Sequence, residues 1–210
     1  MLFDFDGPLA RLFAGHPAPD VARLLTDRLD EWGLLTPALR GSEDPLEVIR
    51  GFAHRDRTSE LEKLLTEQEI HAASMATPTP YSDNLVRLLV ARGHQVAITT
   101  NNSPLAVTRY LQGRQLAHLF GPHIHGRTHD PSLMKPHPHC LVSAMESTGA
   151  YAAECLMIGD SVGDYEAARQ VGVTFLGYAH RPQKETRLRD AGASHVIRSL
   201  QDLCIALRDA

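Results

Sequence analysis

Apolar positions from Tyr81 to the end of the chain alternate between two spacings. Residues three and four apart predict amphipathic helices, and short continuous apolar runs predict buried strands. The predicted strands cover residues 95–99, 123–126, 155–158, 173–176 and 195–197. The predicted helices cover residues 82–92, 104–116, 137–147, 165–171, 184–190 and 200–207. This alternation is typical of right-handed β-α-β crossovers, so we predict an α/β fold with a Rossmann-like parallel sheet and helices on both faces.

The segment from about residue 15 to residue 78 has a different pattern. Its apolar residues recur at helical spacing, and no strand pattern is present. They form three groups: Val21, Leu24, Leu25, Leu29 and Trp32; Leu46, Ile49 and Ala53; and Leu61, Leu64 and Leu65. Asp44, Pro45 and Glu47 supply an N-cap, a first-turn proline and a capping-box glutamate for the second helix. We therefore predict an all-helical insertion that returns through 77–80, where consecutive Xaa-Pro steps disfavour helix.

Length and composition agree with one core and one insertion. The chain has 210 residues, of which 43% are hydrophobic, enough to bury one core of ordinary size but not two full domains. We predict that residues 1–14 and 79–210 form an α/β core domain and that residues 15–78 form the helical insertion.

Charge and cysteine content argue against several classes of protein. The net charge of −4 gives no electrostatic reason to expect nucleic acid as a partner. No apolar run approaches the ~18 residues of a membrane span, and no leader pattern precedes the first motif, so we expect no membrane association. The cysteines Cys140, Cys155 and Cys204 are widely spaced, which favours reduced thiols in a cytoplasmic protein.

Two acids follow the first apolar run, in Leu2-Phe3-Asp4-Phe5-Asp6-Gly7. Residues two apart on a strand share a face, so both carboxylates point the same way if the strand continues through Asp6. If the chain loosens at Gly7, Asp6 is freer to turn. Adjacent carboxylates repel unless a cation or a shared proton relieves them. Taken alone, the motif is explained equally well by a turn with incidental acids.

Three further segments change that interpretation. The predicted strand at 95–99 runs into Thr99-Thr100-Asn101-Asn102-Ser103, Lys135 precedes a Pro-x-Pro step, and Leu156–Asp164 is an apolar strand that ends in Gly159-Asp160 and Asp164. Together and in this order, the four segments resemble the motifs of the haloacid dehalogenase-like (HAD) phosphohydrolase superfamily. The resemblance extends from residue 2 to about residue 200. It implies a Rossmann-like core, and it makes the helical insertion a C1-type cap.

The resemblance also assigns roles to the acids. It implies that Asp4 is the nucleophile and that Asp4 and Asp160 supply carboxylates to Mg²⁺, a cation that prefers oxygen ligands. The backbone carbonyl of Asp6 would complete the protein ligands of the metal. Asp164 would hold Lys135 or a metal-bound water. Asp6 would be the general acid and base, which favours phosphate chemistry over dehalogenation because a halide leaving group needs no proton.

The remaining motif residues would bind the phosphoryl group. The resemblance assigns its oxygens to Thr100 and Lys135, with Asn101 beside them, and positioning and charge stabilisation carry most of the catalysis in such reactions. Thr99 competes with Thr100 for this role. We choose Thr100 because it directly precedes Asn101, as the family pattern requires, and because Thr99 then points to the other side of the strand.

We therefore predict a cytoplasmic, Mg²⁺-dependent phosphohydrolase. It would cleave a small phosphorylated metabolite through an aspartyl-phosphate intermediate, as a monomer or a weak homodimer. Two alternatives remain open: a phosphomutase of the same fold, and a catalytically idle HAD-like domain that binds a phosphorylated ligand or a protein. The substrate is not readable from the sequence. Arg11, Arg50 and Arg57 are candidate anion contacts, but solvated helix faces explain them equally well.

Three details depart from the pattern or stand outside it. Pro8 replaces the usual Thr or Val after the first motif and, lacking an N–H, should stiffen the following flap. The first strand has only three residues before Asp4, so we expect that a few natural residues precede it. The pairs His123-x-His125 and His137-x-His139 could ligate Zn or Ni, although a polar loop region explains them better.

Overall fold

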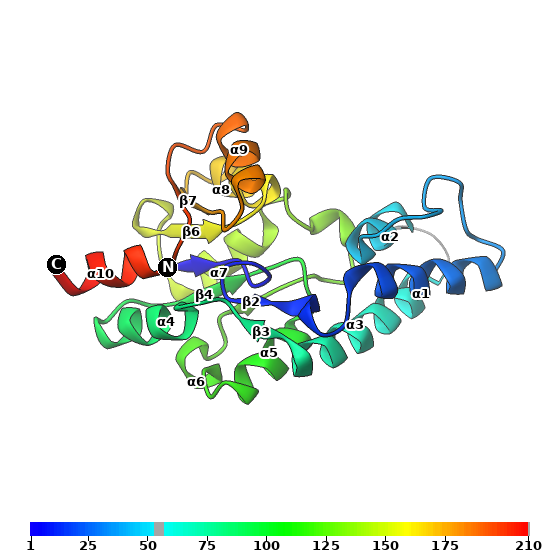
Figure 1. Ribbon diagram of the computed structural model, residues 1–210, viewed down its shortest axis with the longest axis horizontal. Helices are drawn as coiled ribbons and strands as arrows, with labels where there is room; N and C mark the ends of the chain where they lie inside the picture. Colours follow the sequence, from blue (N-terminus) through cyan, green and yellow to red (C-terminus); the bar gives the residue numbers. More distant parts are fainter. Residues whose placement is uncertain (53–56, 210) are drawn as a thin grey trace.

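A parallel sheet lies at the centre of the larger part of the molecule (Figure 1). The computed structural model describes residues 1–52 and 57–209, and over these ranges the sheet has six strands in the order β5-β4-β1-β6-β7-β8. The strands are β1 (Leu2–Phe3), β4 (Ala97–Thr99), β5 (Ile124–His125), β6 (Leu156–Gly159), β7 (Thr174–Tyr178) and β8 (Val196–Ile197). Each neighbouring pair is parallel. The predicted α/β class and Rossmann-like sheet are confirmed.

Helices cover both faces of this sheet. They are α4 (Ser82–Ala91), α5 (Pro104–Gly113), α6 (Ala117–Phe120), α7 (His139–Thr148), α8 (Val162–Gln170), α9 (Pro182–Asp190) and α10 (Gln201–Asp209). Side chains of the central strands alternate between the faces. Phe3, Ile98 and Ile158 pack with α4, α5 and α10, whereas Leu2, Ala97 and Met157 pack with α7 and α8. None of the described helices is long and apolar enough to cross a membrane.

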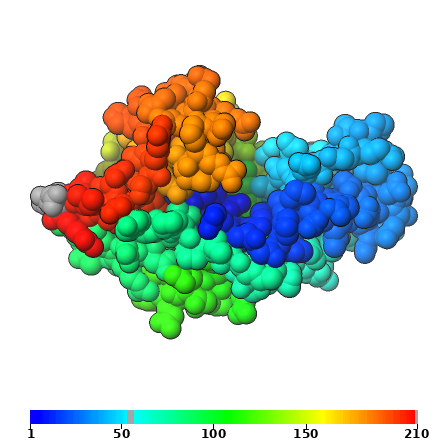
Figure 2. Space-filling view, in the orientation of Figure 1, coloured from blue at the N-terminus to red at the C-terminus, as the bar shows by residue number. Residues whose placement is uncertain are grey.

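The described part of the segment before α4 forms three α-helices, and its blue residues project as a lobe from one side of the molecule (Figure 2). After a short 3-10 turn at Leu12–Ala14 come α1 (Ala18–Glu31), α2 (Pro45–Phe52) and α3 (Thr58–Met75). Their buried side chains form a separate apolar cluster: Val21, Leu25, Leu29, Val48, Ile49, Phe52, Leu61 and Leu65. These faces agree with the predicted ones, except that Leu24 is 37% exposed. Ala53, which we assigned to the second helix, lies outside the described residues.

Two short strands connect these helices to the sheet region. β2 (Ala10–Arg11) pairs antiparallel with β3 (Thr77–Pro78), and Ala10 lies opposite Pro78. The expectation of a segment without strands up to residue 78 is therefore wrong. Proline suits an extended edge strand because it has no N–H to donate. No local pattern reveals the pairing, since its two strands are distant in the sequence.

Most element boundaries fall within a few residues of the predicted ones, and the start of α8 shows why some do not. The helix begins at Val162 and not at Tyr165. Ser161 Oγ accepts from the backbone N–H of Asp164 at 3.2 Å, and Asp164 Oδ2 accepts from the backbone N–H of Ser161 at 3.0 Å. This capping box starts the helix directly after β6, so Asp164 faces the end of the strand.

Candidate active site

The carboxyl ends of the central strands meet at one edge of the sheet, where ligands bind in folds of this type. Every residue that the sequence motifs singled out there lines a single cavity of about 310 Å³: Asp4, Asp6, Thr100, Asn101, Lys135, Asp160 and Asp164. The helical segment closes the opposite side of this cavity with Phe13, Ala18, Glu43, Asp44 and Leu46. The cavity thus lies between the sheet and the helices.

Lys135 occupies the centre of this site. Its side chain is 4% exposed, and its Nζ donates to Asp4 Oδ1 at 2.8 Å, to Asp164 Oδ1 at 2.5 Å and to the carbonyl of Thr99 at 2.8 Å. Burial alone would lower the pKa of Lys135, but the carboxylates of Asp164 and Asp4 outweigh it and raise that pKa. Lys135 is therefore a buried cation whose position is fixed by its acidic partners.

Three buried carboxylates converge beside this lysine. Asp4, Asp160 and Asp164 each offer one oxygen, and these oxygens lie within 4.8 Å of one another. Burial, followed by the neighbouring Asp164, raises the pKa of Asp4 to about 7. Burial likewise raises the pKa of Asp160 to about 6. Since a cation would relieve both groups, the donor set fits a small divalent ion with a preference for oxygen, such as Mg²⁺.

Asp164 also holds the local backbone. Its Oδ2 accepts from the N–H of Asp160 at 3.1 Å and from the hydroxyl of Ser161 at 2.7 Å, while Oδ1 takes the bond from Lys135. Asp164 thus anchors both the lysine and the strand end that carries Asp160. The resemblance gives Asp164 either Lys135 or a metal-bound water as its partner, and the structure shows the contact with Lys135.

Gly7 leaves room for Asp160 on the other side of the cluster. Its φ is +121°, and a Cβ at this position would lie 2.2 Å from Asp160 Oδ2, so neither the conformation nor the space allows another residue. Pro8 has no N–H to donate in this turn. A hydrogen bond from the N–H of Gly7 to the carbonyl of Ala10, at 2.7 Å, closes the turn. The carbonyl of Gly7 accepts from Thr79 Oγ1 at 2.5 Å, which ties this turn to the return strand.

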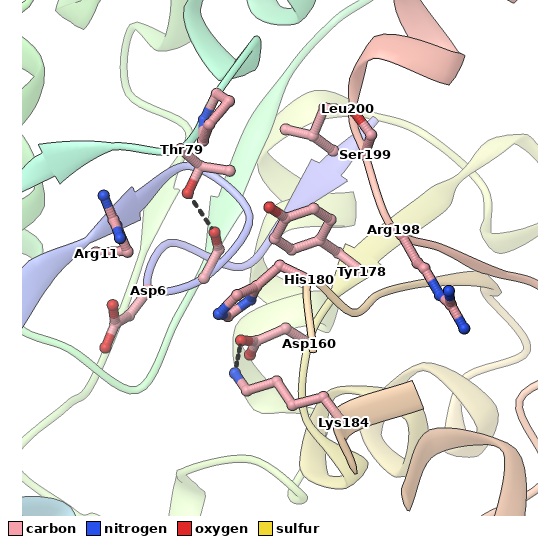
Figure 3. Close-up of a pocket in the computed structure, with 12 residues that line it drawn as sticks. Asp6, Arg11, Thr79, Asp160, Tyr178, His180, Lys184, Arg198, Ser199 and Leu200 are labelled. Carbon is pink, nitrogen blue, oxygen red and sulfur yellow. Dashed lines mark hydrogen bonds and ion pairs between the residues drawn. The ribbon is translucent and has the colours of Figure 1, made fainter. Parts of the chain in front are cut away.

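The carboxylate of Asp6 lies apart from the other three. Strand β1 ends at Phe3, and Asp6 Oδ1 accepts from the backbone N–H of Leu12 at 2.9 Å. Figure 3 shows this carboxylate pointing away from Asp160 and Lys184. Burial raises the pKa of Asp6 to about 6, although the Leu12 hydrogen bond opposes the shift. The chain therefore loosens after Phe3, and the side chain of Asp6 turns toward Leu12, in the flap formed by β2, β3 and the 3-10 turn that follows β2.

The side chains of Thr99 and Thr100 point in different directions, as we expected when we chose Thr100 over Thr99 as the phosphoryl-binding residue. Thr99 Oγ1 contacts the carbonyl of Phe3 at 3.4 Å inside the sheet. Thr100 lines the cavity, where its hydroxyl donates to Asn102 Oδ1 and accepts from the N–H of Asn102, both at 3.1 Å. The side chain of Asn101 is occupied by the backbone of Lys135, accepting from its N–H at 2.7 Å and donating to its carbonyl at 3.1 Å.

The structure adds one residue to this site that the motifs did not indicate. Lys184, at the start of α9, donates to Asp160 Oδ2. It also lines a second cavity of about 470 Å³, which shares Asp6 and Asp160 with the first and is bordered by Arg11, Tyr178 and His180 (Figure 3). In the sequence Lys184 looks like any solvated helical lysine, because its acidic partner comes from a different strand.

The three candidate arginines have separate surroundings. Arg50 donates to the carbonyl of Lys135 at 3.1 Å and so reaches the edge of the site. Arg11 donates to Thr77 Oγ1 at 3.1 Å on the flap. Arg57 lies 4.9 Å from the centre of the Trp32 ring, within the helical segment.

The two histidines of the first pair share one hydroxyl group. His123 and His125 both contact Ser147 Oγ, at 3.0 and 2.8 Å. Among the described residues, the only group of three or more acids, histidines or cysteines close enough to share a metal ion is the aspartate cluster.

Comparisons with known proteins indicate the family to which this chain belongs. The family model described as haloacid dehalogenase-like hydrolase matches residues 1–172. The phosphoglycolate phosphatase of Pseudomonas syringae pv. syringae is 28% identical over 204 residues, covering 88% of this chain and 72% of that protein. The phosphoglycolate phosphatase of Aliivibrio fischeri is 28% identical over 186 residues, covering 81% of this chain and 79% of that protein.

Solved structures share the fold along nearly the whole chain. A hydrolase from Pseudomonas syringae matches with a TM-score of 0.71 and 20% identity, covering 99% of this chain and 97% of that one. A HAD family hydrolase from Deinococcus radiodurans, solved with bound phosphate and sodium, matches with a TM-score of 0.64 and 25% identity, covering 99% and 94%. The family model, the sheet topology and the motif residues in one cavity agree, and the chain belongs to the haloacid dehalogenase-like hydrolase family.

Proposed function

We propose that this protein is a Mg²⁺-dependent phosphatase that acts on a small phosphorylated metabolite through an aspartyl-phosphate on Asp4. One observation carries the proposal: the buried Nζ of Lys135 contacts both Asp4 and Asp164 in a cavity that also holds Asp6, Thr100 and Asp160. A cationic group beside a carboxylate nucleophile reduces the repulsion between that carboxylate and an incoming phosphate.

The metal would be held by the carboxylates of Asp4 and Asp160 and by the backbone carbonyl of Asp6. When bound, Mg²⁺ would neutralise charge on the phosphoryl group and on the attacking carboxylate. The raised pKa values of Asp4, about 7, and Asp160, about 6, support this arrangement, since burial disfavours the charged form of both acids and a bound cation would favour it. Asp164 would keep Lys135 and the Asp160 backbone in place through the contacts described above.

Asp6 would transfer the protons. In its acid form it would protonate the leaving oxygen, and as a carboxylate it would accept a proton from the water that attacks the Asp4 phosphate. A pKa of about 6 suits both tasks near neutral pH, because each protonation state remains populated. Thr100 and Lys135 would bind the phosphoryl oxygens. Asn101 would contribute by holding the Lys135 backbone.

The relatives support the reaction and suggest where the substrate search should begin. The curated relatives from Pseudomonas and Aliivibrio are named phosphoglycolate phosphatases, and the Deinococcus hydrolase was solved with phosphate. We propose that the helical residues 15–78 act as a cap that contacts the leaving group. A cytoplasmic location and a monomeric or weakly dimeric state remain predictions from the sequence.

The test is phosphate release from a panel of phosphate monoesters, including p-nitrophenyl phosphate and 2-phosphoglycolate, with Mg²⁺ or with EDTA. We expect turnover with Mg²⁺ only, and none from Asp4→Asn, which removes the attacking oxygen with almost no change in volume. More than about a tenth of wild-type activity in this variant would mean that another residue attacks. Absent turnover across the panel would favour a binding domain over an enzyme, and turnover that persists in EDTA would contradict the Mg²⁺ requirement.

A further inference from the structure

A buried ionic cluster joins helix α3 to the loop that follows β4. The carboxylate of Glu69, on α3, is fully buried and accepts bonds from Asn102 Nδ2 and from the backbone N–H of Ser103, both at 2.9 Å. It also pairs with both terminal nitrogens of Arg127 at 3.0 Å. Figure 1 shows α3 alongside α5, the helix that this loop opens. Glu69 therefore connects the helical segment directly to the loop that carries Thr100.

Arg127 completes the cluster from a third element, the loop after β5. Its side chain is 1% exposed, its Nε donates to Glu62 Oε2 at 2.8 Å, and its Nη1 donates to the carbonyl of Asn101 at 2.9 Å. Burying these charges costs desolvation free energy, which an apolar cluster of the same volume would avoid. A cluster of this kind fixes geometry more effectively than it stabilises the fold. What it fixes here is the backbone from Asn101 to Ser103.

That backbone leads to both proposed phosphoryl-binding groups. Asn102, held by Glu69, makes two hydrogen bonds to the hydroxyl of Thr100. Asn101, whose carbonyl is held by Arg127, makes two hydrogen bonds to the backbone of Lys135. Each step is a hydrogen bond of 3.1 Å or less. The chain of contacts thus runs from α3 to the two groups that would hold the phosphate.

We propose that Glu69 and Arg127 are positioning residues: they set the loop 100–103, and with it Thr100 and Lys135, according to how the C-terminal half of α3 is docked on the core. Phosphoryl binding is therefore coupled to the placement of the helical segment. The proposal rests on the proposed function in one respect, namely that Thr100 and Lys135 bind the phosphoryl group.

The chain offers a matched control on the same helix. Glu62 is also buried on α3 and also pairs with Arg127, but among the described residues no hydrogen bond joins it to loop 100–103. Glu69→Gln replaces an oxygen that accepts bonds with an NH₂ group that cannot, which disrupts the contact with the loop. Arg127→Lys keeps the charge but loses the planar fork that reaches Glu69 and Asn101 together. Glu62→Gln perturbs the cluster at a comparable depth and leaves the loop contacts intact.

Three measurements on each full-length variant test the proposal: the dissociation constant for inorganic phosphate with Mg²⁺ by calorimetry, kcat and KM, and hydrogen exchange of the peptides that contain residues 100–103 and Lys135. We expect Glu69→Gln and Arg127→Lys to weaken phosphate binding by at least about tenfold and to lower kcat, because misplacement of such groups by ~1 Å is costly. Exchange in both peptides should rise. Glu62→Gln should change phosphate binding by less than about twofold, even if its Tm falls.

The proposal is overturned if all three variants lower the Tm alike while phosphate binding and exchange of 100–103 stay at wild-type values, since the cluster would then be structural only. If Glu69→Gln does not fold, Arg127→Lys gives the same comparison. If the wild type neither binds phosphate nor hydrolyses any ester, the proposed function fails, and the exchange data alone decide whether Glu69 and Arg127 hold the loop.

Discussion

The ammonium group of Lys184 donates to Oδ2 of Asp160, the carboxylate at the end of β6. The side chain of Lys184 is 38% exposed, whereas that of Asp160 is 7% exposed. The lysine thus covers a buried acid from the solvent side. Because Asp160 is also a proposed metal ligand, the ammonium group would compete with Mg²⁺ for this carboxylate.

Replacing Lys184 should therefore tighten metal binding. For Lys184→Met, we expect a several-fold lower half-saturating Mg²⁺ concentration in the phosphatase assay and a lower Tm in EDTA, because the acidic cluster loses a compensating charge. Titration of activity and of Tm with Mg²⁺ measures both effects. Lys63→Met, on the surface of α3, is the control. An increased Mg²⁺ requirement in Lys184→Met would show that the lysine supports the metal site and does not compete with it.

Asp160 and Asp164 should differ in what they contribute. Asp160→Ala removes a proposed metal ligand and should raise the Mg²⁺ requirement more than Asp164→Ala, for which a loss of ~10–100-fold in affinity or activity is typical of a supporting residue. Asp164→Ala should cost more stability, because Asp164 caps α8 and pairs with Lys135. Mg²⁺ titrations and thermal melts of both variants separate the effects. The reverse order would exchange the two roles.

Asp6→Asn should separate the two halves of the reaction. The variant keeps the backbone carbonyl and can still accept the Leu12 bond, but its carboxamide cannot act as an acid or a base near neutral pH. An alkyl phosphate, whose leaving group needs a proton, should be slowed in the first step. With p-nitrophenyl phosphate, Asp4 should still be phosphorylated, giving a burst of about one product per enzyme before slow turnover. Equal slowing on both esters, without a phosphorylated Asp4 by mass spectrometry, would make Asp6 structural.

The stability of the metal-free protein should depend on pH through the same acids. Burial raises the pKa of Asp6 from 3.8 to about 6 and that of Asp4 from 3.8 to about 7. At a pH between 3.8 and the raised pKa, each of these acids keeps its proton in the folded state but has released it in the unfolded chain. The free energy of unfolding therefore falls as the pH rises through this range. In EDTA, the Tm of Asp6→Asn relative to wild type should increase from pH 4 to about pH 7. A Tm difference independent of pH would contradict the raised pKa of Asp6.

Much of the fold could be predicted because its signals are local. The order of strands and helices follows from apolar spacing, and the motif residues sit where strands end, so the sheet edge collects them. The direction of Asp6 could not be predicted, since it depends on a bond to Leu12 on the flap. Lys184 was missed because its partner Asp160 belongs to a different strand.

The buried charges were missed for a related reason. Glu62 and Glu69 lie next to other polar residues along α3, and charged side chains in such a helix normally belong to its solvated face. They are buried because α3 lies on the core and Arg127 meets them there. Only the packing of distant segments reveals this, so no property of α3 alone could have predicted it.

Because β2 pairs with β3, the two ends of the helical segment are attached to the core at one place, where the segment could be removed or replaced. Its two ends leave the core side by side, with Arg11 opposite Thr77, so a hairpin turn of about two residues could join them in a deletion protein. The obstacle lies elsewhere: under a transplanted segment that lacks Glu62 and Glu69, Arg127 would keep a buried charge with no acidic partner. A transplanted segment therefore requires either these two acids or a redesigned residue 127. The contact that limits such an exchange lies under α3, away from the paired strands β2 and β3.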